Sequence, residues 1–160
     1  MDIWNCENWK QTNTTPFQKS GLYFRVEDGV DPEVRRACLE FARYLRKKYV
    51  FPSRVAVYIK PTYHIRAANG EMVYGTCFRP AEKSDFSYIR ISTGDYSEMV
   101  QNQGKDNALA TLLHCIAEML THYYQWLNDF NELTEDEEES QADQCATEIL
   151  NEYALTREHP

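Results

Sequence analysis

The amino-acid sequence predicts one α+β domain: an N-terminal helix, an antiparallel sheet of three to four strands, and two C-terminal helices. Two observations predict this class. Apolar residues recur every three or four positions in segments near both ends of the chain, and every second position between them. The alternating stretch contains Asn69-Gly70, a dipeptide typical of two-residue hairpin turns. At 160 residues and without an internal repeat, the chain is predicted to be a single domain over residues 1–160.

The first predicted helix follows an irregular N-terminal segment. Residues 1–30 show no clean period, so we expect an arm that packs on the domain through its aromatic side chains: Trp4, Trp9, Phe17 and Tyr23. Asp31-Pro32 has the pattern of an N-cap followed by proline at the first helical position. Apolar residues then recur at helical spacing from Val34 to Tyr49, which predicts a helix over residues 32–49.

The middle of the chain is predicted to form the sheet. Its candidate strands are residues 53–59, 63–67, 72–79 and 88–92. Pro61 separates the first two strands, and Asn69-Gly70 joins the second to the third as a hairpin. Thr93-Gly94-Asp95 ends the last strand, because this combination of residues is typical of a turn.

The C-terminal part is predicted to be a hairpin of two helices. The helical period returns over residues 106–128 and is followed by a turn. Thr134 and Glu137 then have the spacing of a capping box, in which each side chain bonds the other residue's backbone N–H. The last helix is therefore predicted to run from Thr134 to about Arg157.

Charge and composition exclude several classes of protein. The chain has 17 Lys and Arg and 25 Asp and Glu. Residues 132–143 alone contain seven acidic residues and no basic one. A nucleic-acid partner is not expected, because phosphate binding needs clustered cations. No membrane span is expected either, because His114 and Glu118 interrupt the longest apolar stretch. The polar start and the five scattered cysteines indicate a cytoplasmic protein with reduced thiols.

Polar residues on the two C-terminal helices form the candidate site. His114, Glu118 and His122 form a polar stripe on the first of these helices, which on most amphipathic helices is simply the solvent-exposed face. Glu139, however, falls in the apolar seam of the last helix. A carboxylate buried there needs a partner. In an antiparallel hairpin, the helical rise of about 1.5 Å per residue sets Glu139 level with His122. Glu118, His122 and Glu139 are thus predicted to converge, whereas His114 lies about 12 Å along the axis from His122 and takes a supporting role.

The sequence around these residues resembles a known family. Leu120-Thr121-His122-Tyr123-Tyr124-Gln125-Trp126, followed by Glu139-Ser140-Gln141-Ala142-Asp143, is similar to the active-site region of small zincin metallopeptidases, the SprT-like, gluzincin-type proteins of bacteria and their phages. That family has HExxH on one helix and ExxxD or ExxAD on the next. Two His and the later Glu bind zinc, the first Glu is the general base, and the Asp orients a ligand. The resemblance implies that His122 and Glu139 are metal ligands and that Asp143 supports them, together with His114.

Two positions depart from the family pattern. Glu118 stands where the first zinc-binding histidine belongs, and Met119 stands where the general base belongs. Glutamate can bind zinc, but a second anionic ligand makes the ion a poorer Lewis acid. Methionine accepts no proton, and general-base assistance is worth about 10²–10⁴ in rate. No catalytic residue is therefore assigned, and the predicted zinc site of Glu118, His122 and Glu139 is weak or vacant.

Three functions are compatible with these residues. The first is a degenerate metallopeptidase, or pseudoenzyme, that acts by binding a protein or peptide. Its many tyrosines either line a peptide groove beside an edge strand or only reflect the preference of strands for tyrosine. The second is an active zinc metallopeptidase with an unusual Glu/His/Glu site. The third is an unrelated acidic interaction module, such as an inhibitor encoded by a phage or mobile element, that presents carboxylates to a basic surface.

Overall fold

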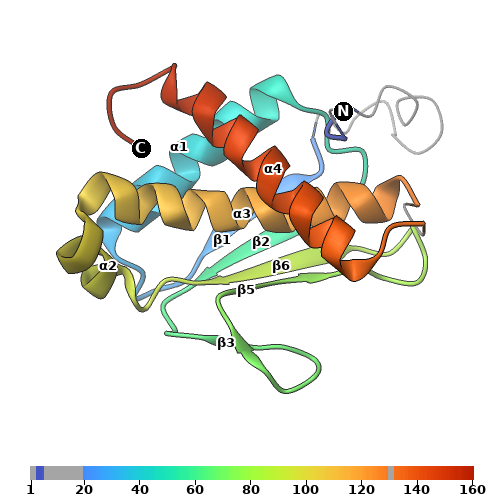
Figure 1. Cartoon of the computed structure of the whole chain (residues 1–160), viewed down its shortest axis with the longest axis horizontal. Helices are drawn as coiled ribbons and strands as arrows, with labels where there is room; N and C mark the ends of the chain where they lie inside the picture. Colours follow the sequence, from blue (N-terminus) through green and yellow to red (C-terminus); the bar gives the residue numbers. More distant parts are fainter. Residues whose placement is uncertain (1–2, 6–19, 130–131) are drawn as a thin grey trace.

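The computed structural model describes residues 3–5, 20–129 and 132–160, and these residues form an α+β fold (Figure 1). Four helices are present in the described residues: α1 (Pro32–Lys48), α2 (Tyr96–Gln103), α3 (Lys105–Leu127) and α4 (Glu135–Ala154). Six strands accompany them: β1 (Leu22–Val26), β2 (Val55–Lys60), β3 (Ile65–Arg66), β4 (Met72–Val73), β5 (Gly75–Phe78) and β6 (Ser87–Ser92). The predicted α+β class is thus confirmed, while the sheet and the first element differ from the prediction.

The main sheet is mixed, not antiparallel. Its strand order is β1-β2-β6-β5, with β1, β2 and β6 parallel and only the edge strand β5 antiparallel. The reason is the crossover: β1 comes before α1, so α1 carries the chain back over the sheet and β2 starts at the same end as β1. The helix at residues 32–48 is therefore the second element. Leu22, Phe24 and Val26 alternate with exposed Tyr23 and Arg25, a strand pattern inside the segment predicted as an irregular arm.

The Asn69-Gly70 hairpin is confirmed, but it is smaller than predicted. β3 and β4 pair antiparallel on either side of it, and Gly70 has a φ of 88°, which glycine adopts easily. The single strand predicted over residues 72–79 is divided into β4, which belongs to this hairpin, and β5, which joins the main sheet. Tyr74 is the residue between them. The short ladder explains the division, because two residue pairs are all that the hairpin contains.

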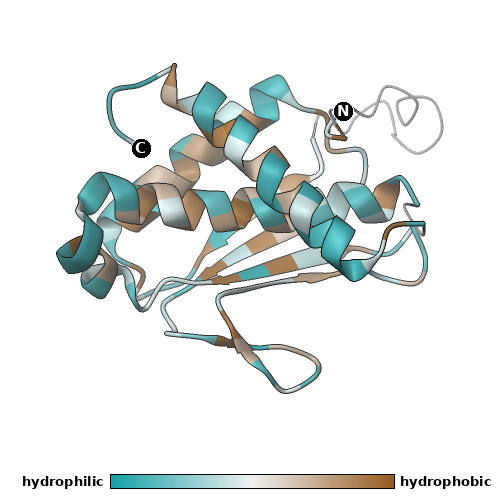
Figure 2. Cartoon of the chain, in the orientation of Figure 1, coloured by the Kyte–Doolittle hydropathy of each residue, from teal (hydrophilic) through white to brown (hydrophobic). Residues whose placement is uncertain are grey.

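The helix ends follow the sequence closely. The Asp31 side chain accepts a hydrogen bond of 2.8 Å from the N–H of Glu33, and Thr134 with Glu137 forms the predicted capping box. The helix α2 was not expected, and Gly104, with a φ of 85°, separates it from α3. Figure 1 shows α1, α3 and α4 on one side of the sheet. Figure 2 shows apolar residues concentrated between these layers, which is where the core lies.

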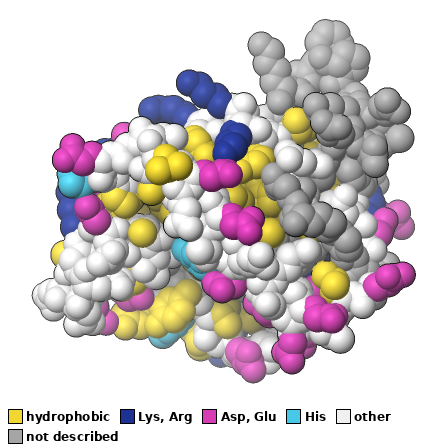
Figure 3. Space-filling view, turned by 45° about the horizontal axis from the view of Figure 1, so that its top comes forward, with side chains coloured by type: hydrophobic (Ala, Val, Ile, Leu, Met, Phe, Trp, Pro, Cys, Tyr) yellow, Lys and Arg dark blue, Asp and Glu magenta, His cyan; other side chains and the backbone are white. Residues whose placement is uncertain are grey.

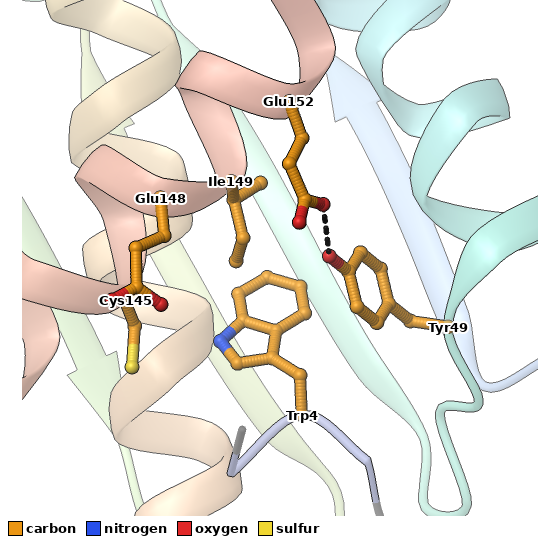
Figure 4. Close-up of a pocket in the computed structure, with 6 residues that line it drawn as sticks. All are labelled: Trp4, Tyr49, Cys145, Glu148, Ile149 and Glu152. Atoms are coloured by element: carbon orange, nitrogen blue, oxygen red, sulfur yellow. Dashed lines mark hydrogen bonds between the residues drawn. The ribbon is translucent and has the colours of Figure 1, made fainter. Parts of the chain in front are cut away.

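One residue of the N-terminal arm is anchored as predicted. Trp4 is 1% exposed, and its ring centroid lies 4.8 Å from that of Tyr124 and 5.0 Å from that of Tyr49. Its indole Nε1–H donates to the Thr121 hydroxyl at 3.0 Å. Figure 4 shows the indole held between Ile149 and Glu152 of α4 and the ring of Tyr49. Trp9 and Phe17 lie outside the described residues, and Tyr23 belongs to β1.

Gly21 is required where β1 begins. A Cβ at this position would lie 2.3 Å from the backbone oxygen of Ser53 and 2.9 Å from that of Phe51. We expect Gly21→Ala to lower the free energy of unfolding by about 2 kcal/mol, because the backbone of the segment before β2 must move to admit the methyl group. Urea unfolding followed by circular dichroism measures this loss. Gly70→Ala is the matched control, since nothing lies within 4 Å there and only the positive φ costs about 1 kcal/mol. Equal losses in the two variants would contradict the close approach.

Candidate functional site

A groove runs along the edge strand β5. It encloses about 720 Å³. We call it the β5 groove. On the sheet side it is lined by β5, by Arg79 after it, and by Tyr88 and Arg90 of β6. On the helical side it is lined by Met119 and His122 of α3 and by three carboxylates of α4: Glu135, Glu138 and Glu139. Figure 3 shows acidic side chains gathered at the end of the molecule where α4 begins. The turn of the β3–β4 hairpin closes one end of the groove.

The open edge of β5 lines this groove. Antiparallel pairs alternate between hydrogen-bonded and non-bonded residues. The N–H of Ser92 donates to the carbonyl of Tyr74 at 2.9 Å, so the bonded pairs that follow are Thr76 with Arg90 and Phe78 with Tyr88. The backbone groups of Gly75 and Cys77 therefore point away from β6. They form a row of donors and acceptors along the groove that another extended chain can use.

His122 and Glu139 meet on the helical side of the groove, at the same height on the two helices, as the helical rise predicted. His122 Nε2 lies 3.2 Å from Glu139 Oε1. On its other side, His122 Nδ1 lies 2.7 Å from Gln125 Oε1. The amide nitrogen of Gln125 donates to the carbonyl of Glu138 and to Gln141 Oε1, which leaves its oxygen to accept from His122. His122 thus donates from Nδ1 to Gln125, and Nε2 is the ring nitrogen that it presents to Glu139 and the groove.

Two α4 carboxylates differ in their surroundings. Glu139 was expected inside the packed seam, but its side chain is 61% exposed because it lies where the seam opens into the groove. The Glu138 side chain is only 19% exposed. It is held by Arg79, whose Nη1 lies 3.2 Å from Glu138 Oε2. This ion pair joins the end of β5 to the beginning of α4.

Glu118 does not join His122 and Glu139. It turns toward the preceding turn of α3, where Glu118 Oε1 lies 2.6 Å from His114 Nδ1. The other ring nitrogen of His114 lies 3.4 Å from Asp143 Oδ1. The predicted site is therefore divided into a pair, His122 and Glu139, and a triad, His114, Glu118 and Asp143. A residue on a helix can reach neighbours four positions before or after it, and helical spacing alone did not decide whether Glu118 contacts His114 or His122.

The triad could hold a metal ion. Its ligand atoms lie within 4.8 Å of one another. In the described part of the chain, it is the cluster of three His, Cys, Asp or Glu side chains that meets this spacing. In the present arrangement the two carboxylates occupy opposite edges of the His114 ring. Binding an ion would require one ring nitrogen to exchange its carboxylate partner for the metal. As it stands, His114 joins α3 to α4, with Glu118 at one ring nitrogen and with Asp143 and the Thr147 hydroxyl near the other.

The triad makes stability depend on pH. The pKa of His114 is raised, first by its hydrogen bond to Glu118 and then by the attraction of the Glu118 and Asp143 charges, while partial burial opposes the rise. Because the folded pKa lies above the unfolded value of about 6.5, the stabilisation is complete below that pH and is lost as pH rises through the folded pKa. We expect His114→Gln to cost about 0.5–1 kcal/mol at low pH and less at high pH.

Urea unfolding of both proteins at about pH 5.5 and about pH 9 measures this difference. His159→Gln is the control, because the His159 side chain is 65% exposed and its partner Asp106 is 52% exposed. A cost of His114→Gln that grows with pH would contradict the assignment.

The residues of the groove wall can hydrogen-bond and pair with charges. Met119 lies in this wall, and the carboxylate of Glu118 is engaged by His114. Burial raises the pKa of the Cys77 and Cys115 thiols to about 12, so neither is a ready nucleophile. Outside the groove, His114 Nε2 lies 3.2 Å from the hydroxyl of Thr147.

Sequence reasoning missed three parts of this site. The open edge of β5 was missed because the strand was assigned to the hairpin, and the strand order is a long-range property. Arg79 carried no signal beyond its place at the end of a predicted strand. Gln125 was on the polar stripe of α3 but was given no role, although an amide three residues from His122 is well placed to orient its ring.

Comparisons with protein-family models, with curated proteins and with solved structures gave no match to this chain. None of the helices in the described residues is long and apolar enough to cross a bilayer.

Proposed function

We propose that this protein binds an extended peptide along β5 and does not cleave it. The observation that carries the proposal is that the open edge of β5 and the His122–Glu139 pair face the same groove. Strand addition at an exposed sheet edge is a common mode of peptide recognition, in which backbone hydrogen bonds supply affinity and alternate side chains supply specificity. Gly75 and Cys77 offer two such sets of backbone groups.

The charge of the groove specifies the peptide. Successive side chains of an added strand point to opposite faces, so every second one faces α3 and α4. There it meets Glu135 and Glu139, while Glu138 is already compensated by Arg79. Glu135 has no ion-pair partner in the described residues and Glu139 has only His122, so lysine or arginine is favoured at the positions that face the helices. The proposed ligand is thus an extended segment with alternating basic residues.

The absence of cleavage follows from the residues in the groove wall. The resemblance to small zincin metallopeptidases supports a shared ancestry, with His122, Glu139 and Asp143 matching that family's positions. Met119 cannot activate a water molecule, and Glu118 is engaged by His114. The pair of His122 and Glu139 supplies two of the three protein ligands of a catalytic zinc site. Zinc bound there would need Glu118 to leave His114, so we expect weak zinc binding.

Peptides with a modified backbone test the binding mode without changing the protein. A fluorescein-labelled peptide of alternating lysine and valine should bind in fluorescence anisotropy. N-methylation removes a donor, and we expect it to weaken binding about tenfold or more at residues whose N–H faces β5. Methylation at the intervening residues, whose N–H faces solvent, should have little effect. Equal losses at both sets of positions would contradict strand addition.

Variants of α4 test the charge preference. Glu135→Gln with Glu139→Gln should weaken binding of the lysine peptide severalfold, and the loss should shrink at high salt. Asp136→Asn with Glu148→Gln is the matched control, because it also removes two α4 charges and neither residue lines the groove. Equal effects of the two changes would show that the α4 carboxylates act only through net charge.

A second function is supported by a specific observation. Glu118 lies one turn before His122 on α3, so a rotation of its side chain could complete a Glu/His/Glu zinc site. An active metallopeptidase would then carry one zinc ion per chain when purified without added metal. It would also cleave the peptide in a reaction that a chelator stops. Intact peptide after prolonged incubation with zinc supports the binding function instead.

A further inference from the structure

The face of the sheet opposite the helices carries a patch of aromatic and arginine side chains. We call it the open-face patch: Tyr23, Arg25, Arg54, Tyr58, Phe86 and Tyr88. On β2 the inward residues Val55, Val57 and Ile59 are buried, whereas Tyr58 is 37% exposed on the other face. Tyr23 and Tyr88 are each 38% exposed, and Phe86 is 60% exposed. Figure 1 shows α1, α3 and α4 on the opposite side of the sheet.

The strand register brings these side chains together. Tyr23 and Tyr88 flank Ala56 in one row, and Arg25 lies beside Tyr58 in the next. Arg54 lies over two rings, with its guanidinium carbon 4.9 Å from the centroid of Tyr23 and 4.9 Å from that of Phe86. Neighbouring strands are about 4.8 Å apart, so the rows form one continuous surface.

The charge of this face is opposite to that of the chain. None of the strand residues that point to it is acidic, although the whole chain has a net charge of −8. Lys60 is paired with Glu27 at 2.7 Å, but neither Arg25 nor Arg54 has an ion-pair partner in the described residues. Arg90, beside Tyr58, bonds Thr76 and the carbonyl of Arg66, which are neutral groups. Its cationic charge is therefore also uncompensated.

The geometry points to a docking surface for an acidic protein. Protein interfaces are enriched in Tyr, Phe and Arg and depleted in Lys, Asp and Glu, which is the composition of the open-face patch. The uncompensated arginines would pair with carboxylates of the partner, and the rings would cover apolar surface between them. Single-stranded nucleic acid also stacks on aromatic side chains, but it needs denser positive charge than this acidic chain provides. A second copy docked face to face would bring like charges together.

The test uses the full chain labelled with ¹⁵N. A peptide in which glutamate alternates with leucine and tyrosine is titrated in, and amide chemical shifts report where it binds. We expect shifts at Tyr23, Arg25 and Tyr58, which do not line the β5 groove, no comparable binding of the matched lysine peptide to this face, and weaker binding at high salt. Shifts confined to β5 and α3, or equal binding of the two peptides to the open-face patch, would overturn the proposal. Tighter binding of a dodecamer of thymidine to the same amides would assign the face to nucleic acid instead.

Charge variants make the test specific. Arg25→Glu with Arg54→Glu should weaken binding of the acidic peptide at least tenfold. Arg25→Lys with Arg54→Lys should keep its affinity within about threefold of the unmodified protein. If the glutamate variant does not fold, Arg25→Gln with Arg54→Gln measures the same loss with less perturbation. Binding of the lysine–valine peptide to the β5 groove should stay unchanged in a folded variant. Acidic-peptide binding that survives the loss of both arginines would overturn the proposal.

Discussion

Replacing Glu118 by His together with Met119 by Glu is expected to turn this protein into a zinc-dependent peptidase. The new imidazole would lie one turn before His122, and Glu139 already lies 3.2 Å from His122 Nε2. Two histidines and a glutamate would then bind zinc and leave one position open for water. The new carboxylate beside this water would supply general-base assistance worth about 10²–10⁴ in rate. Elemental analysis measures the zinc, and mass spectrometry of the lysine–valine peptide measures cleavage.

A matched variant separates metal binding from catalysis. Glu118→His with Met119→Gln should bind zinc equally well and cleave the peptide slowly, because an amide cannot accept the proton. The change at position 118 also removes the partner of His114, so a small loss of stability is expected in both variants. A folded double variant without zinc would remove the support for metallopeptidase ancestry. Peptide binding along β5 would be unaffected by that result, because it depends on the edge strand.

Removing the Trp4 side chain is expected to have the largest effect on stability. Trp4→Ala should lower the free energy of unfolding by about 3–5 kcal/mol, the range for truncating a buried aromatic residue. The indole is 1% exposed and contacts the rings of Tyr49, Phe51 and Tyr124, which belong to segments far apart in the sequence. Its loss leaves a cavity between α3, α4 and the segment after α1 (Figure 4). Urea unfolding followed by circular dichroism measures the change.

A second substitution distinguishes packing from hydrogen bonding. Trp4→Phe keeps a ring in the cavity but removes the N–H that donates to Thr121, so its cost should be nearer 1–2 kcal/mol. The Thr121 hydroxyl still donates to the carbonyl of Ala117 at 2.8 Å, which limits the cost of the lost bond. If Trp4→Ala costs less than about 1 kcal/mol, the N-terminal arm is not held by this residue.

The sequence alone was sufficient for features that depend on neighbouring residues. Asp31 caps α1, the Thr134–Glu137 capping box begins α4, and Asn69-Gly70 turns the β3–β4 hairpin. Each depends on side chains and backbone groups within four residues of one another. The meeting of His122 and Glu139 was also predictable, because the rise of a helix and the length of a turn fix relative height in an antiparallel pair.

The tertiary structure decided which strands are neighbours and which partners the polar side chains take. The parallel order of β1, β2 and β6 places β5 at the edge and leaves one face of the sheet open, and this order depends on pairing between residues about 30 positions apart. Glu118 had a histidine within reach on either side, and its bond to His114 depends on α4 bringing Asp143 to the same ring. Periodicity and caps act within a few residues, whereas strand order and rotamer choice are set by contacts that exist only after the chain has folded.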